Sequence, residues 1–373
     1  MSDTVGDWLE LVHRRYPPGH AADWDQVGLH VGDPAWAVER VLVTLDVTRA
    51  VVTEAADGPP TLVLAHHPLL FRPLQRLTSQ TASGAIALAA ARADVAVAAA
   101  HTNLDVAADG AGTSDPVVQT LDLHDVRPLI TELRDGGEAK LAVHVPTEAL
   151  DAVMTAMWDA GAGHIGNYDR CSFRVGGTGT FRPLEGTDPY TGSVGEVSHE
   201  EEQRLEVIVP RSRAGAVVRA MVAAHPYEEV AYDLFPTLSG AEVGLGRVGT
   251  LPQPLTLRAL AARVRDELPA PHLRYAGNPE RLVRTVATVG GAGDSLIGAA
   301  IGSGADVYIT GDLRHHVTLD ALTLGLALID AGHHATEQAA MPVWIERLRE
   351  GARAEGLEAE LVASRVDTTP WAR

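Results

Sequence analysis

Short runs of apolar residues alternate with longer amphipathic stretches in the first third of the chain. The apolar runs at 41–46, 61–65 and 95–100 predict strands, and the stretches at 48–56 and 84–93 predict helices. Strands that are apolar along their whole length are typical of a sheet covered on both faces. The pattern therefore predicts an α/β fold for this part of the chain.

The last third of the chain shows the same alternation. The predicted elements are a helix at 257–267, a strand at 284–289, a helix at 294–301, a strand at 306–310, a helix after 316, a strand at 326–330 and a helix at 337–350. We therefore expect an α/β fold here as well.

A different order of elements follows the change in composition near 132–138. The predicted elements are a strand at 140–145, a helix at 148–160, a long loop region at 176–195, a strand at 204–209, a helix at 213–224 and a strand at 230–235. Two successive strand–helix–strand groups predict a small ferredoxin-like α+β domain, inserted into the α/β fold. The expected parts are 1–131, the insertion at 132–243, and 244–373.

Carboxylates are concentrated between Val194 and Glu206, where Arg204 is the only Lys or Arg. Clustered carboxylates usually stay in water. We therefore expect a solvated edge here rather than a cation site.

Composition and charge exclude several classes of protein. The 373 residues are 46% apolar and carry a formal net charge of −19, which disfavours broad contact with nucleic acid or anionic lipid. Cys171 is the single cysteine, so disulfides within the chain and Cys-rich zinc sites are excluded. No signal peptide and no apolar stretch of membrane-spanning length is visible. We expect a cytoplasmic protein without membrane contact.

Histidines and carboxylates follow several of the predicted strands. His66 and His67 come directly after the second apolar run, and Asp105 lies shortly after the third. His333 and Glu337 follow the last predicted strand, four residues apart, so that a helix would place both on one face. Ligands of α/β sheets bind beyond the carboxyl ends of strands, where these side chains can meet. Three imidazoles and two carboxylates suit two divalent ions such as Zn, Fe or Mn.

Each of these residues alone has a simpler interpretation. Asp105 could cap a helix, and Glu337 could favour a helix N-terminus. The pair His315-His316 also follows a strand and competes as a metal ligand. His101 and His334 could donate hydrogen bonds to ligand carboxylates or to a substrate. The joint placement of the five residues at the ends of separate strands is what favours the metal site.

Two glycine-rich segments have features of phosphate-binding motifs. Gly161–Gly166 has the letters of a dinucleotide fingerprint, but it follows a predicted helix instead of a strand. Gly290–Gly293 lies between a strand and a helix, where backbone N–H groups can hold a phosphate. Helix–sheet packing explains the second segment equally well, so both interpretations stay open for it.

Five motifs occur in the order in which one protein family has them. They are Asp23-Trp-Asp-Gln-Val-Gly-Leu29, Ala65-His-His-Pro-Leu69, His101-Thr-Asn-Leu-Asp105, Ile309-Thr-Gly-Asp312, and Asp330-Ala-Gly-His333 with Thr336-Glu337. With these motifs the chain resembles, over nearly its whole length, the NIF-three-like proteins, which are often labelled GTP cyclohydrolase type 2 homologues. Two departures are Gln26, where the family often has Asn, and His30, where it often has Gln.

The middle of the chain resembles the inserted domain of longer family members. The segments Gly161–Tyr168, Gly179–Pro183 and His225–Asp233 look like parts of their PII/CutA-like domain. The resemblance implies a two-lobed α/β module interrupted by this domain. It also implies a toroidal homohexamer with two divalent ions per subunit, bound by His66, His67, Asp105, His333 and Glu337.

Three functions are compatible with this sequence. The first is a metal-dependent hydrolase of a small nucleotide-like or phosphorylated molecule, with the family label of GTP cyclohydrolase. The second is a non-enzymatic metal-handling or regulatory hexamer whose inserted domain senses a small ligand. The third is a protein–protein adaptor, which the acidic surface permits without supporting.

Overall fold

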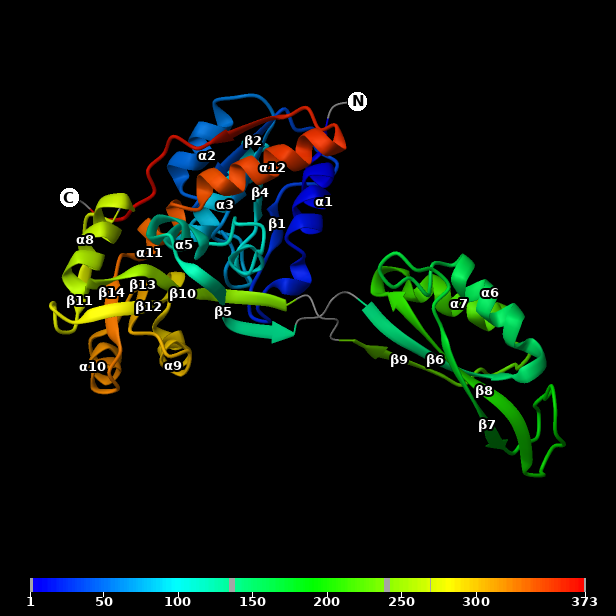
Figure 1. Ribbon diagram of the computed structural model, residues 1–373. Helices are drawn as coiled ribbons and strands as arrows, with labels where there is room; N and C mark the ends of the chain where they lie inside the picture. Colours follow the sequence, from blue (N-terminus) through cyan, green and yellow to red (C-terminus); the bar gives the residue numbers. More distant parts are fainter. Residues whose placement is uncertain (1–2, 134–137, 238–241, 269, 372–373) are drawn as a thin grey trace. The chain divides into compact units, whose positions relative to one another are not determined.

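The chain forms two compact units in the computed structural model, which describes residues 3–133, 138–237, 242–268 and 270–371 (Figure 1). The flanking unit consists of Met1–Glu132 and Glu242–Arg373, and the middle unit of Leu133–Ala241. The composition change near 132–138 includes residues 134–137, which lie outside the described residues. Among the described residues, no helix combines the length and the apolar character needed to cross a membrane.

The first sheet of the flanking unit has the strand order β1-β4-β3-β2-β15. Its strands are β1 (Gly28–Val31), β2 (Arg40–Thr44), β3 (Thr61–Ala65), β4 (Ala96–Ala99) and β15 (Glu360–Ala363). All neighbours pair in parallel except β1, which runs antiparallel to β4. The carboxyl ends of β2, β3 and β4 therefore meet at one edge of this sheet.

Helices cover both faces of the first sheet. They are α1 (Val5–Arg15) and α12 (Met341–Glu355) on one face, and α2 (Arg49–Ala56) and α3 (Ala82–Arg92) on the other. Trp8 of α1 and Trp344 of α12 are completely buried against the strands. This confirms the α/β arrangement that the apolar strands predicted.

Threonines fix where several helices of the flanking unit begin. The hydroxyl oxygens of Thr48, Thr81 and Thr256 accept a backbone N–H of the first turn of α2, α3 and α8 (Leu257–Glu267). Thr4 forms a reciprocal capping box with Asp7 at the start of α1. Such caps satisfy N–H groups that have no partner within the helix.

The second sheet of the flanking unit has the strand order β11-β14-β13-β12-β10-β5. Its strands are β5 (His124–Leu133), β10 (Glu242–Thr256), β11 (Arg274–Ala276), β12 (Leu282–Ala292), β13 (Val307–Gly311) and β14 (Ala327–Asp330). The central strands β12, β13 and β14 are parallel, so their carboxyl ends also meet at one edge.

Helices cover this sheet on both faces as well. They are α5 (Asp115–Leu121), α8 and α11 (His333–Gln338) on one face, and α9 (Ile297–Gly302) and α10 (His315–Thr323) on the other. Tyr308 of β13 is completely buried in the second of these two cores.

The middle unit has one antiparallel sheet with the order β7-β8-β6-β9. Its elements are β6 (Glu138–Pro146), α6 (Leu150–Asp159), β7 (Phe173–Phe181), β8 (Ser198–Pro210), α7 (Ala214–Ala224) and β9 (Tyr232–Pro236). Both helices pack on the same face, where Leu141, Val143, Leu205 and Val207 are buried.

Two sequence-based expectations were wrong in detail. β7 occupies part of the predicted loop at 176–195, because this edge strand is glycine-rich and largely exposed and so lacks apolar alternation. The predicted helix at 337–350 is two helices, α11 and α12. Pro342 lies in the first turn of α12, where its missing N–H is tolerated but where it cannot continue a preceding helix.

Candidate metal centre

Two neighbouring histidines lie directly beyond the carboxyl end of β3. The backbone N–H of His66 donates to the Thr44 carbonyl at 3.0 Å, and that of His67 to the Leu45 carbonyl at 2.9 Å, so both residues are fixed to the end of β2. His66 is completely buried, and its Nδ1 donates to the Ala100 carbonyl at 3.1 Å. Its Nε2 has no hydrogen-bond partner among the described residues.

Three further imidazoles are held in the same way as His66. Each donates its Nδ1–H to a carboxylate at 2.8 Å: His67 to Asp46, His101 to Asp25 and His333 to Asp312. A histidine that is held through Nδ1 presents Nε2 as its ligand atom. The orientation of all four imidazoles is therefore the one that metal-binding histidines commonly have.

Glu337 lies among three of these imidazoles. On α11 it follows His333 by one helical turn, and its side chain is only 5% exposed. Its Oε2 is 3.1 Å from Nε2 of both His67 and His333, and its Oε1 is 3.7 Å from Nε2 of His66. Oε2 nevertheless has no hydrogen-bond partner within the described part of the chain. Buried ligand atoms that are close together but not hydrogen-bonded favour a cation between them.

Asp105 approaches the same place from the short helix α4 (Thr102–Asp105). Its Oδ1 lies 3.6 Å from Nε2 of His66 and accepts a hydrogen bond of 2.6 Å from the hydroxyl of Thr113. The structure thus brings together the five residues that the sequence singled out.

Two groups of ligand atoms each lie within 4.8 Å of one another. One consists of His66, His67 and His101, and the other of His67, His333 and Glu337. His101, for which the sequence predicted only an accessory role, therefore shares a potential metal group with two of the proposed ligands. Imidazole nitrogen and carboxylate oxygen fit Zn, Fe or Mn.

The charges of the cluster depend on one another. Burial alone would raise the pKa of Glu337, but His333, His66 and His67 hold it well below its usual range. Burial alone would lower the pKa of His67, but Asp46 and Glu337 raise it to about 10. Glu337 and Asp312 likewise raise the pKa of His333 to about 9, against the effect of burial. In the absence of a metal ion, protons therefore occupy this centre at neutral pH.

The competing histidines lie elsewhere. His315 and His316 open α10, with their ring centroids 5.2 Å apart, and neither belongs to a potential metal group among the described residues. His334 is next to His333 on α11 and is likewise outside both groups.

The glycines of the Gly290–Gly293 segment serve the centre in a way that the sequence did not indicate. β12 continues through Gly290 and Gly291 to Ala292. A Cβ atom at Gly291, which has φ +70°, would collide with the carboxylate of Glu337, and one at Gly290 would collide with Thr113. These glycines therefore leave room for Glu337 and Thr113.

Sequence reasoning missed the carboxylates that hold the imidazoles. Asp25 and Asp312 lie within the family motifs, and Asp46 ends the first apolar run, but no spacing links them to their histidines. Burial would raise the pKa of Asp25, but hydrogen bonds from His101 and Thr102 lower it to about 2. The Asp25 carboxylate that holds His101 is therefore ionised at neutral pH.

Comparisons with known proteins identify the same protein family over most of the chain. The sequence model of the family described as "Duf34/NIF3 (NGG1p interacting factor 3)" matches residues 4–370. A protein of Bacillus subtilis named "GTP cyclohydrolase 1 type 2 homolog" is 42% identical over 328 residues, which are 88% of this chain and 87% of the relative. A protein of Halalkalibacterium halodurans with the same name is 40% identical over 364 residues, which are 97% of each chain.

Solved structures show a similar architecture. The Bacillus cereus protein related to NIF3 has a TM-score of 0.72 and 39% identity, and the match covers 99% of each chain. The Staphylococcus aureus protein SA1388 has a TM-score of 0.78 and 25% identity, with 100% of this chain and 99% of that one covered.

Proposed function

The chain belongs to the Duf34/NIF3 family, and on that premise we propose that it is a metal-dependent hydrolase with two divalent ions in its centre. The proposed ligands are His66, His67, Asp105, His333 and Glu337, and the proposed ions are Zn, Fe or Mn. The observation that carries this proposal is the pair of buried ligand atoms, Nε2 of His66 and Oε2 of Glu337, that have no hydrogen-bond partner among the described residues.

Bound divalent ions would supply Lewis acidity and a nucleophilic water at neutral pH. The protein contributes orientation, because the carboxylates of Asp46, Asp25 and Asp312 fix three imidazoles through Nδ1. Burial of Glu337 and His66 keeps bulk water away from the ligand atoms and strengthens electrostatic interactions there.

Two exposed aromatic side chains beside the centre support a small planar substrate. Trp24 is 58% and Phe71 48% exposed, and their ring centroids are 5.6 Å apart. They lie 6.1 and 6.3 Å from the ring of His101. Apolar rings that remain exposed next to polar catalytic groups are suited to stack on a nucleobase. The names of the relatives make GTP the first nucleotide to test.

The proposal is tested by turnover of GTP and of a panel of other nucleotides and phosphoesters by the metal-loaded protein. We expect His66→Ala to abolish turnover, and Trp24→Ala to raise KM more than it lowers kcat, because Trp24 would contact only the planar part of the substrate. Leu324→Ala, which removes a 67% exposed apolar side chain directly after the end of α10, serves as the control. A fully metal-loaded protein without turnover across the panel would exclude the hydrolase.

We further propose that the chain assembles as a toroidal homohexamer and that the middle unit is a ferredoxin-like, PII/CutA-like domain. The hexamer is what the resemblance of the sequence motifs to this family implies. The β-α-β-β-α-β order, with strand order β7-β8-β6-β9 and both helices on one face, supports the ferredoxin-like domain. Sedimentation equilibrium tests the assembly, because a monomer of 39.4 kDa or a dimer would exclude the hexamer.

A second candidate function is a regulatory assembly in which the middle unit senses a small ligand. A large cavity in this unit favours it. The two functions are distinguished by His66→Ala, which removes the activity of an enzyme but leaves ligand binding by a sensor intact.

A further inference from the structure

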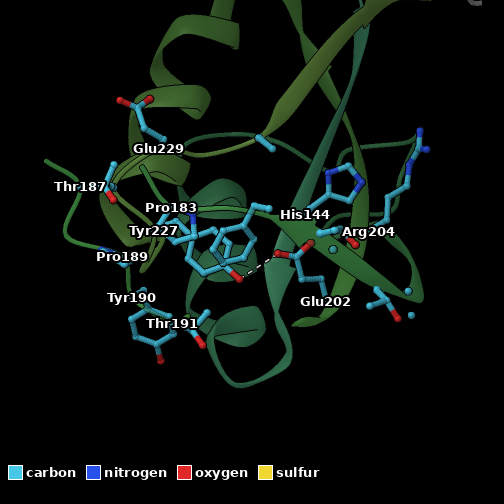
Figure 2. A pocket seen from close by; sticks show the side chains of 18 of the residues that line it. His144, Pro183, Thr187, Pro189, Tyr190, Thr191, Glu202, Arg204, Tyr227 and Glu229 are labelled. Carbon is cyan, nitrogen blue, oxygen red and sulfur yellow. Dashed lines mark hydrogen bonds between the residues drawn. The ribbon is translucent and has the colours of Figure 1, made fainter. Parts of the chain in front are cut away.

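A cavity of about 610 Å³ lies in the middle unit, on the face of the sheet opposite α6 and α7. Leu205 and Val143 point toward these helices, so that Arg204, Glu202 and His144, which alternate with them along β8 and β6, point to the other face. Figure 2 shows these side chains around the cavity, with Tyr190 and Tyr227 contributed by the segments that border it. Its volume is that of a typical small-molecule site.

Glu202 is a buried carboxylate in this cavity, with an exposed fraction of 8%. Its side chain accepts one hydrogen bond among the described residues, from the Tyr227 hydroxyl at 3.0 Å (Figure 2). Among the described residues that line the cavity, the one guanidinium, that of Arg204, pairs instead with Glu206 at 3.1 Å. Within the described chain, no cationic side chain pairs with Glu202.

The charge of this cavity therefore favours a cationic ligand. A buried carboxylate is costly unless a cation or several hydrogen bonds compensate it. Burial and the neighbouring Glu202 raise the pKa of Tyr227, so this phenol stays neutral and donates without neutralising the charge. Glu228 and Glu229 at the border of the cavity add two more carboxylates. An anionic ligand such as a nucleotide would be repelled.

The walls of the cavity suit a flat apolar body. The rings of Phe181 and Tyr190 each lie with their centroids 6.0 Å from that of Tyr227. A Cβ atom at Gly177 would meet nothing within 4 Å, so this position of β7 opens into free space opposite Glu202. A Cβ atom at Gly179 would collide with the Glu202 carboxylate, so glycine leaves room for that side chain.

We propose that this cavity binds a small planar organic cation, such as an amidine, a guanidine or an aromatic amine. The cationic group is paired with Glu202, and the apolar body lies against Tyr190 and Tyr227, whose ring faces attract cations. The site uses only residues of the middle unit. It goes beyond the proposed metal centre, and either proposal can fail without the other.

The test measures binding to the full-length protein by ligand-observed NMR and calorimetry. The probes are benzamidine, benzamide and benzoate, which share a ring and a planar substituent but differ in charge. Benzamidine is expected to bind at least about tenfold more tightly than benzamide, and benzoate is expected not to bind. Absence of benzamidine binding at about 5 mM, or equal binding of the three probes, would overturn the proposal.

Two variants locate the binding. Glu202→Gln keeps the shape and removes the charge, and is expected to weaken benzamidine binding by about tenfold or more. Its matched control is Glu201→Gln, because Glu201 is the exposed neighbour on β8 and does not line the cavity. Unchanged benzamidine binding by Glu202→Gln contradicts the site.

The second variant, Gly177→Leu, adds an apolar side chain at a position where a Cβ atom meets nothing within 4 Å, and should abolish binding while Glu202 remains. Its fold is checked by its melting temperature. In ligand-free protein Glu202→Gln should melt no lower than the native chain, since it removes an uncompensated charge. If Glu202→Gln does not fold, benzamidine binding to folded Gly177→Leu decides whether the proposed site is correct. Retained benzamidine binding by Gly177→Leu overturns the proposal.

Discussion

A carboxylate buried among imidazoles keeps its charge only while a proton or another cation is close to it. Glu337 is in this position, with Nε2 of His67 and of His333 each 3.1 Å from its Oε2. The two Nε2 atoms are themselves 3.3 Å apart, so a proton on one opposes a proton on the other. Glu337 thus favours protonation of Nε2 of His67 and of His333, and a metal ion competes with protons for these two atoms.

Metal binding is therefore predicted to release protons. Because the pKa of His67 is raised to about 10 and that of His333 to about 9, the metal-free centre is protonated at neutral pH. Loading at pH 7 should release between about one and two protons per chain, and metal affinity should fall as the pH falls. Calorimetry in buffers of different ionisation enthalpy measures this release. A reaction heat that does not depend on the buffer would contradict the assignment of these histidines.

The histidines of the metal centre follow the ends of strands. β3 ends directly before His66 and His67, β4 ends shortly before His101, and β14 ends shortly before His333, the first residue of α11. The sequence could locate His66, His67 and His333 because each follows the end of an apolar run. An apolar run that stops marks the edge of the sheet where ligands bind. The spacing of His333 and Glu337 could not show that His333–Gln338 is a helix, because a non-helical turn would also have brought these two side chains together.

The residues that hold the ligands were not predictable in this way. Asp25, Asp46 and Asp312 come from different elements and meet their histidines only in the folded chain. Glu202 was expected at a solvated edge, but its side chain lies on the cavity face of β8 against Tyr227 and is only 8% exposed, whereas the neighbouring Glu201 is exposed. Burial by tertiary contacts outweighs the local polarity of such a segment.

Gly291 of β12 is predicted to be essential for the shape of the centre. Gly291→Ala places a methyl group against the Glu337 carboxylate at a positive φ, so it should lower the free energy of unfolding by about 1–3 kcal/mol and reduce metal content. Gly298→Ala is the control, because a Cβ atom there meets nothing within 4 Å and because alanine has a higher helix propensity than glycine in α9. Thermal melts and metal analysis of both variants check this, and equal behaviour of the two would refute it.

For the whole molecule, the division into two units predicts where metal removal is felt. All five proposed ligands belong to the flanking unit. A metal ion whose free concentration is 100 times its Kd stabilises the folded state that binds it by about 2.7 kcal/mol. Chelation should therefore increase hydrogen exchange in peptides of α11, β3 and β12 and leave peptides of β6 and β8 unchanged. Exchange measured by mass spectrometry on the native chain tests this, and equal deprotection of both units would show that the centre does not lie where we place it.

The most direct test of the metal centre is the metal content of protein purified without an affinity tag. It is measured by mass spectrometry beside His66→Ala/His333→Ala and, as a control that also removes two histidines, His315→Ala/His316→Ala. We predict about two transition-metal ions per chain in the native protein and in the control, and a sharp loss in the first variant. No metal in the native protein after attempted reconstitution, or equal metal in all three, would contradict the account.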